Sequence, residues 1–453
     1  MPLPDLIEIV PLNKPVRAEI TVPGSKSITN RALILAALAD GEVTLTGALW
    51  SEDTQIMVEC LQKLGFAVNV ASDPEEFCNR TITVKGLGGK IPNAGTADKP
   101  LELFVGNAGT AARFLSAFVC LGNGVYRLSG VARMHERPQA ALFSALRELG
   151  YRVESEKGND KLPVKIFGEG ESARCVPTKS CKVSIEESSQ FASALLLCAK
   201  VGNWKIEVVG ENAEESPYVA MTSKLMEVFP KNGGTFQIEP DASSGSYFWA
   251  AGELRTDLQP EKTPKEELFT VTVASWPQLG TQVDTRFKGF MIYMSGREFL
   301  DRHDGQISRT SQLGDSIMTA IVIAPLKKVE WKFTDLGRLR VQECERVVAL
   351  RTELTKCGAK VVEEGDTLTV WPSPLHGAEI ETYNDHRMAM CFAILGLKVP
   401  GIKIKNPACV KKTFPNFFQK VAGPPPNGLG AEIWEIKGGQ RARKLSGEDL
   451  FAE

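Results

Sequence analysis

The sequence predicts a mixed α/β protein with at least two hydrophobic cores, on three observations. The chain has 453 residues, and a single core stops growing well below this size. A helix that ends in Gly and is followed by a short alternating strand recurs along the chain. Between the copies lie helices that are apolar on most faces, and such helices are buried. Together these features indicate repeated α/β units wrapped around central helices.

The recurring unit is a helix that stops at Gly and leads directly into a strand. It surrounds Gly65, Gly150, Gly233 and Gly358. Gly is the residue expected where a helix stops in a left-handed turn, and the residues after it alternate in character, as in a strand. The first three copies are about 80 residues apart, which is too long for a solenoid repeat. Ordinary α/β sequence without a repeat is the alternative interpretation.

Four helical stretches are apolar on most of their faces and are predicted to form the centres of the domains. They are RALILAALAD, GTAARFLSAFVCL, SQFASALLLCA and DSIMTAIVIAP. By contrast, GPPPNGLG at 423–430 ends the predicted compact part, and the charged residues that follow predict a loosely attached tail.

Composition and charge exclude several classes of protein. The hydrophobic content of 43% and the charged content of 24% are ordinary for a globular protein. A net charge of -2 leaves no basic footprint for nucleic acid. No apolar run approaches the roughly 18 residues of a membrane span, and the N-terminus carries acids where a signal peptide would carry Lys or Arg. We therefore expect a cytoplasmic monomer with no nucleic-acid or membrane partner.

Cysteine and histidine usage argues against disulfides and metals. The ten cysteines never form a C-x-x-C pair, and Cys60, Cys120, Cys198 and Cys391 lie in apolar helical stretches. These cysteines are expected to be reduced and to fill the core. The four histidines show no paired spacing, so a zinc site is not expected.

Cationic, hydroxyl and small residues recur at strand-to-helix turns. VPGSKSITNR places Lys26 and Arg31 at a helix start, where free N–H groups attract anions. It is not a Walker A loop, because G-x-x-x-x-G-K-[ST] is absent. In GNAGT, residues 106–110, small residues let backbone N–H groups approach a ligand. For each stretch alone, a capped helix with solvated cations or a tight connection is an equally good interpretation.

Five further stretches carry the same residue types. They are SGVARMHERP, with Arg133 and Arg137; EESSQFASALL, with Ser188, Ser189 and Gln190; LRVQECERVVALRTEL, with Glu343 and Arg346; ETYNDHRMAMCFAIL, with Asp385, His386 and Arg387; and CVKKTFPNFF, with Lys411 and Lys412. A surface salt bridge worth under about 1 kcal/mol is the alternative for Glu343 and Arg346, spaced i, i+3. Taken together, the stretches predict a convergent pocket for a multiply charged small molecule.

Nine motifs, seven of them from these stretches, resemble those of the EPSP synthases (3-phosphoshikimate 1-carboxyvinyltransferases) and occur in the same order. They are GSKSITNRALILAALA, GNAGTAARFL, ARMHERP, SSQFASALL, PDASSGSYF, GDSIMTA, RVQECERVVAL, YNDHRMAM and KTFPNFF. The match runs from about Pro11 to about Phe418 and is most similar to the fungal versions. It implies the α/β (α+β) enolpyruvyl transferase fold, with two similar domains of three βαβαββ units each around buried helices. The implied domains are 1–23 plus 245–422, and 24–244, with 423–453 as a flexible tail.

The resemblance also implies an activity in the shikimate pathway. Family members transfer the enolpyruvyl group of phosphoenolpyruvate to the 5-hydroxyl of shikimate 3-phosphate, release phosphate, and need no metal or cofactor. The implied catalytic residues are Lys26, Asp315, which acts on the acceptor hydroxyl, and Glu343, which exchanges protons at the methylene carbon. The implied substrate-binding residues are Ser27, Arg31, Asn107, Gly109, Thr110, Arg133, Ser188, Ser189, Gln190, Arg338, Gln342, Arg346, His386, Arg387 and Lys412.

On the acceptor side the sequence departs from the family. Gln342 stands where the family has Lys, Arg338 aligns with a family Asn, and Glu215 (or Ser216 in a shifted alignment) aligns with a phosphate-binding Ser. One unit charge at about 4 Å is worth roughly 4 kcal/mol at an effective dielectric of about 20. These changes predict that the protein binds the 3-phosphate of shikimate 3-phosphate more weakly, or that it uses a related cyclic acceptor instead. A different reaction on a related metabolite and a catalytically silent paralogue are the alternatives.

Overall fold

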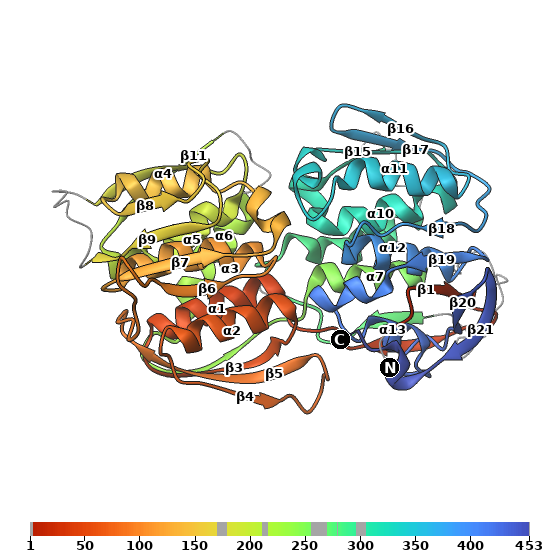
Figure 1. Ribbon diagram of the computed structural model, residues 1–453. Helices are drawn as coiled ribbons and strands as arrows, with labels where there is room; N and C mark the ends of the chain where they lie inside the picture. Colours follow the sequence, from red (N-terminus) through yellow and green to blue (C-terminus); the bar gives the residue numbers. More distant parts are fainter. Residues whose placement is uncertain are drawn as a thin grey trace. The chain divides into compact units, whose positions relative to one another are not determined.

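The computed structural model describes residues 3–169, 179–210, 216–254, 270–278, 280–295 and 305–452. The chain forms two compact units (Figure 1). Unit 1 comprises Met1–Pro23 and Pro240–Glu453, and unit 2 comprises Gly24–Glu239. The sequence-based boundary after Ser244 falls inside helix α7 (Ala242–Glu253). The division lies earlier because Asp241, which caps α7 by accepting from Ser244 N at 2.7 Å, belongs to unit 1.

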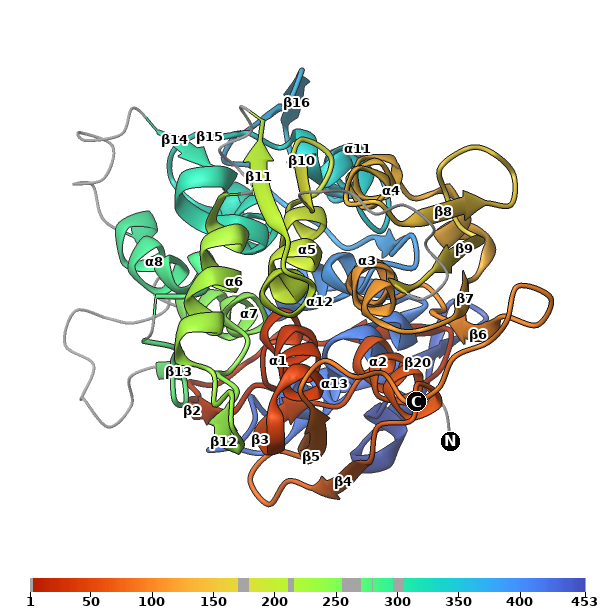
Figure 2. The same ribbon diagram turned by 90° about the vertical axis from the view of Figure 1, so that its left-hand side faces the viewer.

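In its described residues, unit 2 forms three sheets around three inner helices. The strands are, in sheet order, β12 (Gly234–Gln237), β3 (Asp40–Leu49), β5 (Asn79–Leu87) and β4 (Val68–Ser72); β6 (Leu101–Phe104), β7 (Val125–Ser129), β9 (Val164–Phe167) and β8 (Arg152–Ser155); and β10 (Ser180–Ser184) and β11 (Lys205–Val209). The helices are α1 (Lys26–Leu38), α2 (Glu52–Lys63), α3 (Gly109–Phe118), α4 (Ala140–Glu148), α5 (Ser189–Gly202) and α6 (Ser216–Val228). Helices α1, α3 and α5 contact one another at the centre (Figure 2).

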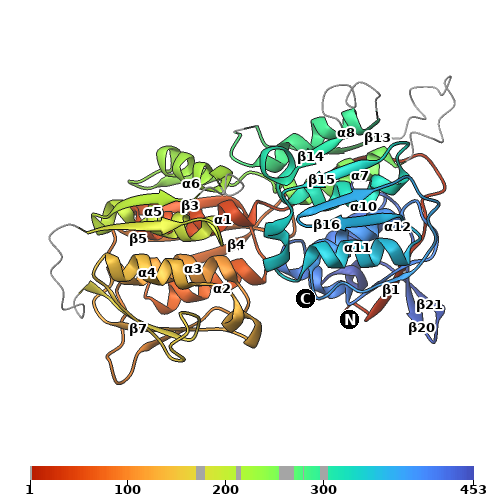
Figure 3. The same ribbon diagram turned by 90° about the horizontal axis from the view of Figure 1, so that it is seen from above.

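Unit 1 repeats this plan. Its strands are, in sheet order, β18 (Glu379–Ile380), β19 (Ile402–Lys405), β1 (Leu6–Ile9), β20 (Ile433–Lys437) and β21 (Gln440–Leu445); β14 (Gln306–Ser308), β15 (Trp331–Thr334), β17 (Thr367–Val370) and β16 (Val361–Glu364); and β13 (Thr270–Val273) and β2 (Arg17–Ile20). The helices are α7, α8 (Phe287–Ser295), α10 (Ile317–Ile323), α11 (Arg346–Lys356), α12 (His386–Gly396) and α13 (Phe417–Ala422). Helices α7, α10 and α12 contact one another, and α11 lies along β16 (Figure 3).

The three four-stranded sheets of the described residues share one topology, and this arrangement confirms the predicted α/β class. In the β6–β9 and β14–β17 sheets the first two strands are parallel, and the last two form an antiparallel hairpin. With their helices, these segments follow the order βαβαββ along the chain. In the third sheet β12, which comes late in the chain of unit 2, occupies the place of the first strand beside β3.

The four glycines of the predicted repeat adopt the left-handed conformation expected from the sequence. Gly65, Gly150, Gly233 and Gly358 have φ angles of +93°, +95°, +93° and +90°. This is the left-handed region, which costs glycine little and other residues more. Gly65, Gly150 and Gly358 follow the last residues of α2, α4 and α11 and let the chain turn into the next strand. Gly233 instead lies in the turn before β12, five residues after α6 ends at Val228, so its predicted place at a helix end was wrong.

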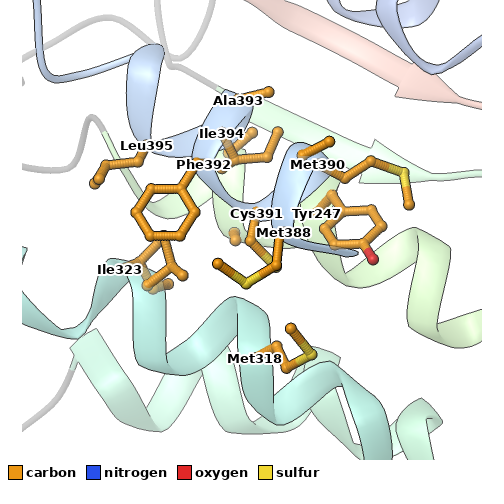
Figure 4. Packing of buried hydrophobic residues seen from close by; sticks show 14 of the residues in the cluster. Tyr247, Met318, Ile323, Met388, Met390, Cys391, Phe392, Ala393, Ile394 and Leu395 are labelled. Atoms are coloured by element: carbon orange, nitrogen blue, oxygen red, sulfur yellow. The ribbon is translucent and has the colours of Figure 1, made fainter. Parts of the chain in front are cut away.

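The apolar helices are buried, as predicted, and their side chains interlock. In unit 1 Met388 and Phe392 of α12 pack beside Met318 and Ile323 of α10, and Tyr247 of α7 lies next to them (Figure 4). All five side chains are at most 1% exposed.

Cysteines contribute to these cores in the way the sequence predicts. Cys60, Cys120, Cys198 and Cys391 are free and buried, and burial raises the pKa of the Cys60 and Cys391 thiols to about 12. None of the helices in the described ranges is long and apolar enough to cross a membrane.

The prediction of a flexible tail after 422 was wrong. β20 and β21 extend the sheet of β1, with Ile7 opposite Glu435 and Ile9 opposite Ile433. Arg441 on β21 donates to both carboxylate oxygens of Glu8 on β1, at 2.8 and 3.0 Å. The charged composition of the segment reflects its exposed face, whereas its alternate apolar residues pack on the core.

Removing residues 424–453 is therefore expected to destabilise unit 1 by more than about 5 kcal/mol. The deletion removes Leu429, Ile433, Leu445 and Leu450, which are all at most 1% exposed, and so loses about 1.5–3 kcal/mol of burial for each large apolar side chain. Thermal unfolding of the shortened and full chains measures the effect. Lys444→Gln on the exposed face of β21 is the control, and we expect it to change stability by less than about 1 kcal/mol. Equal melting temperatures for both chains would contradict the role of the hairpin.

Candidate active site

Asp315 lies among three arginine side chains in unit 1. It belongs to a 3-10 turn, η10 (Gly314–Ser316), that follows a π-helical turn, η9 (Arg309–Leu313). Its Oδ1 accepts from Arg309 Nη2 at 2.9 Å, and its Oδ2 lies 3.4 Å from Arg387 Nη2 and 3.9 Å from Arg346 Nη1. Burial alone would raise the pKa of Asp315, but the positive charges of Arg387, Arg309 and Arg346 outweigh it and hold the pKa well below its usual range. In this state Asp315 is ionised and a weak base.

Arg346 is fixed by a second carboxylate. Its Nε and Nη2 donate to the two oxygens of Asp385 at 2.7 and 3.3 Å, and both side chains are at most 2% exposed. Asp385 also caps α12, because its Oδ1 accepts from Arg387 N at 2.8 Å. One buried carboxylate thus orients Arg346 at the start of α11 and positions the backbone of Arg387 at the start of α12.

The segment before α11 carries Glu343, which forms an ion pair with Lys412 of the 3-10 turn η13 (Pro407–Lys412). Glu343 Oε2 accepts a short hydrogen bond from Lys412 Nζ, and the two side chains are 12% and 9% exposed. Gln342 Oε1 accepts from Arg346 Nη1. Arg338 is half-buried in a 3-10 turn, η12 (Gly337–Val341), and His386 is the buried first residue of α12.

In unit 2, Lys26 begins α1. Its Nζ lies 3.0 Å from Oδ2 of Asp53 in the first turn of α2. Asp53 is buried, and the side chain of Lys26 is 20% exposed. The ammonium group is thus held at a helix N-terminus, where the helix dipole also favours an anion.

A second group in unit 2 surrounds the start of α3. Gln190 Nε2 donates to Thr110 Oγ1 at 3.1 Å, and its Oε1 accepts from Arg113 Nη1 at 2.6 Å. Asn107 O accepts from Arg137 Nη1 at 3.1 Å. The amide group of Gln190 is therefore oriented by two residues of α3.

Arg137, and not Arg133, lies against Gly109. A Cβ atom on Gly109 would lie 2.6 Å from Nη2 of Arg137, so a larger residue there would displace this guanidinium group. Within the described ranges, the buried Nε of Arg137 and Oδ1 of Asn107 have no hydrogen-bond partner, which leaves them polar groups for a ligand. Arg133 is 47% exposed and pairs with Glu136 at 2.7 Å. The family resemblance implied Arg133, and not Arg137, as a substrate-binding residue.

The remaining predicted residues of unit 2 are enclosed. Arg31 donates from Nε to Thr222 Oγ1 at 2.7 Å, from Nη1 to Ser27 O at 2.8 Å and from Nη2 to Ser193 Oγ at 3.1 Å. It thereby links α1 to α5 and α6. Ser188 caps α5 by accepting from Gln190 N at 3.2 Å, and Ser188 and Ser189 are both buried.

Glu215 lies outside the described residues, so the departure from the family there is not part of this geometry. Three residues that received no role from the sequence pair with predicted site residues: Arg309 with Asp315, Asp53 with Lys26, and Asp385 with Arg346. Of these, only Asp385 was named in the sequence analysis, in the charged stretch before an apolar helical run. Within the described ranges no group of three His, Cys, Asp or Glu residues is arranged to hold a metal ion.

Two similar units of βαβαββ character, each with buried carboxylate–cation pairs at helix starts, define a class of α/β proteins suited to small polyanions. Residues 10–421 match the family EPSP synthase (3-phosphoshikimate 1-carboxyvinyltransferase). The 3-phosphoshikimate 1-carboxyvinyltransferase of Trichormus variabilis is 37% identical over 446 residues, with 92% of this chain and 98% of the relative covered. That of Opitutus terrae is 38% identical over 454 residues, with 93% and 98% covered. The chain therefore belongs to the EPSP synthase family.

Solved structures agree on the fold. EPSP synthase from Acinetobacter baumannii superposes with a TM-score of 0.64 at 20% identity, covering 95% of this chain and all of that one (100%). The enolpyruvyl transferase NikO from Streptomyces tendae gives 0.62 at 14% identity, covering 96% and 99%. Since both relatives above are bacterial, the expected likeness to fungal members stays a prediction.

Proposed function

We propose that this protein transfers the enolpyruvyl group of phosphoenolpyruvate to the 5-hydroxyl of shikimate 3-phosphate and releases phosphate. The observation that carries the proposal is the cluster of Asp315, Arg346, Arg387, Glu343 and Lys412 in a chain of the EPSP synthase family. The cluster supplies both cations for an anionic substrate and two carboxylates for proton transfer. We propose a cytoplasmic monomer that uses no cofactor.

Phosphoenolpyruvate carries a carboxylate and a phosphate, and the proposed donor residues match both. Arginine binds such groups with two parallel hydrogen bonds, and lysine binds them as a point charge. We assign Arg346, Arg387 and Lys412 of unit 1 to these anions, with Lys26, Gly109, Arg137 and Gln190 of unit 2. Arg137 replaces Arg133 in the assignment because its guanidinium group lies against Gly109.

Glu343 is assigned to proton exchange at the methylene carbon. In the addition step the carbon–carbon double bond of phosphoenolpyruvate takes a proton from Glu343, and the acceptor oxygen bonds to the adjacent carbon. In the elimination step the carbon–oxygen bond to phosphate breaks, Glu343 takes a proton back, and the double bond forms again. The neighbouring Lys412 ammonium, hydrogen-bonded to Glu343 Oε2, stabilises the carboxylate form between these steps.

Asp315 is assigned to the acceptor hydroxyl, and its surroundings suggest when it acts. Without substrate, Arg387, Arg309 and Arg346 hold its pKa well below its usual range, against the effect of burial. A bound substrate anion would share the charge of Arg346 and Arg387. The pKa of Asp315 would then rise, and Asp315 would become a better base when phosphoenolpyruvate is present.

The assay is phosphate release from phosphoenolpyruvate in the presence of shikimate 3-phosphate. Release that requires both compounds, with enolpyruvylshikimate 3-phosphate as product, supports the proposal. Binding of phosphoenolpyruvate without turnover would point to another acceptor hydroxyl. Activity that survives without phosphoenolpyruvate would mean a different reaction, and the absence of binding would mean a silent paralogue.

The two arginines of ARMHERP give a direct test of the donor assignment. Arg137→Ala should raise KM for phosphoenolpyruvate by roughly 10- to 100-fold, because a charge-assisted hydrogen bond is worth about 1.5–3 kcal/mol. Arg133→Ala, which removes only an exposed pair with Glu136, should change KM by less than about twofold. Steady-state kinetics of both variants decide the matter, and a larger effect at Arg133 would restore the assignment made from sequence.

A further inference from the structure

A buried carboxyl group outside the assigned site lies beneath the turn that carries Asp315. Asp284 belongs to a 3-10 turn, η7 (Val283–Arg286), and is 6% exposed. Its Oδ1 accepts from Ser316 N at 2.7 Å. Its Oδ2 would lie 2.7 Å from a Cβ atom on Gly314, which has a φ angle of +59°. The Asp284 carboxyl group therefore touches the residues on both sides of Asp315.

Only glycine fits at position 314, for two reasons. Its backbone lies in the left-handed region, and a side chain there would collide with Asp284 and with Val283. The turn is thus shaped around the Asp284 carboxyl group, and the direction of the Asp315 side chain follows from the turn.

We propose that Asp284 is a positioning residue for the reaction, which holds the Gly314–Ser316 turn and adjusts the basicity of Asp315 through its own charge. This inference rests on the proposed function, because it assigns Asp284 to the proton transfer attributed to Asp315. Asp284 acts through Asp315 and needs no contact with substrate.

The electrostatic surroundings of Asp284 support this role. Burial and the negative charge of Asp315 raise the pKa of Asp284 to about 7, against the opposing effects of Arg387 and the Ser316 N–H group. Asp241 at the start of α7 raises it further. Arg309 on η9 is committed to Asp315, and Lys288 on α8 lies 4.9 Å from the ring centre of Trp249. Arg286 on η7 itself donates to Ser311 O.

A carboxyl group with this pKa changes charge in the neutral range. Below the pKa Asp284 is neutral, and Asp315 is subject to the arginines alone. Above it, the added negative charge repels the charge on Asp315 and raises the affinity of Asp315 for a proton. The rate of proton removal from the acceptor is therefore expected to increase as the pH rises through about 7.

The kinetic experiment measures kcat of the wild type, Asp284→Asn and Asp284→Glu between about pH 5.5 and 9. The dependence of kcat on pH reports the acid–base groups of the enzyme–substrate complex. We expect kcat of the wild type to rise with an inflection near 7 and Asp284→Asn to lose this inflection. The Asn variant should also lose roughly tenfold in kcat at pH 8 with KM for phosphoenolpyruvate within about twofold. Asp284→Glu should restore an inflection at a shifted pH. Asp449→Asn, which removes a carboxylate paired with Arg443 elsewhere in unit 1, is the matched control.

A second measurement does not depend on turnover. The folded-state pKa of Asp284 exceeds its unfolded value, so its contribution to stability is complete below the unfolded pKa and is lost as pH rises through about 7. Urea unfolding of the wild type should show this loss between about pH 4 and 7, and Asp284→Asn should not. In Asp315→Asn the loss should move to lower pH, because the repelling charge is absent.

The outcomes separate the two ideas. A wild type without turnover would refute the proposed function, while the shift in Asp315→Asn would still report the coupling between the two carboxyl groups. An active wild type whose inflection persists in Asp284→Asn overturns the inference. If the Asn variant does not fold, a wild-type kcat without an inflection near 7, or an unfolding profile unchanged in Asp315→Asn, overturns it as well.

Discussion

Replacing Glu343 with Gln is expected to reduce kcat by about a thousandfold while phosphoenolpyruvate still binds, because general acid–base groups contribute about 10²–10⁴-fold. The amide has nearly the shape of the carboxylate but neither gives nor takes a proton at the methylene carbon. The hydrogen bond from Lys412 to Glu343 Oε2 can be kept by the amide oxygen. Loss of the negative charge beside Lys412 leaves that cation more available to a substrate anion, so affinity should stay equal or rise slightly.

Two measurements separate chemistry from binding in this variant. Stopped-flow or quench experiments follow a single turnover, and calorimetry follows phosphoenolpyruvate binding. The matched control is Glu364→Gln on β16, an exposed position, which should leave both quantities unchanged. A Glu343→Gln variant that keeps more than about a tenth of the wild-type kcat would mean that another group protonates the methylene carbon.

Features that depend on neighbouring residues in the chain could be predicted from the sequence. Local patterns predict the left-handed conformation of Gly65 and Gly358, because glycine is the usual residue after the end of a helix. They also predict that α1 and α10 are buried, because these helices are apolar on most of their faces. The same holds for the predicted α/β class, since alternation of helices and strands is itself local. Resemblance then supplied the family and the residues of its motifs.

Features that depend on distant pairing could not be predicted in this way. The charged composition of the hairpin β20–β21 predicts a loose tail, because its pairing partner β1 lies near the other end of the chain. Asp284 contacts Ser316, and Arg309 contacts Asp315. No motif in the sequence around Asp284 or Arg309 predicts these contacts. In ARMHERP the two arginines are equivalent as sequence, and the 3-10 turn η2 (Ala132–Glu136) places Arg137 and not Arg133 beside Gly109.

Replacing Arg346 with Met is expected to destabilise unit 1 by about 3–5 kcal/mol, because it leaves the buried carboxylate of Asp385 without its partner. Arg346 and Asp385 are 2% and 0% exposed, so water cannot take the place of the guanidinium group. The control lies on the same helix. Arg351, 44% exposed, pairs with Glu363 at 3.2 Å, and Arg351→Met should cost less than about 1 kcal/mol. Urea unfolding at pH 7 measures both.

A second substitution distinguishes loss of the pair from loss of packing. Asp385→Asn keeps an oxygen for Arg387 N at the start of α12 and removes the buried charge. The double variant Arg346→Met/Asp385→Asn should therefore be more stable than Arg346→Met alone, with a coupling energy of about 1–3 kcal/mol. Arg346→Lys tests the other half of the argument: it keeps the charge but cannot hold Asp385 through two parallel bonds and face Asp315 as well. If Arg346→Lys kept wild-type KM for phosphoenolpyruvate, Arg346 would serve the fold alone, and the donor assignment would rest on Arg387 and Lys412.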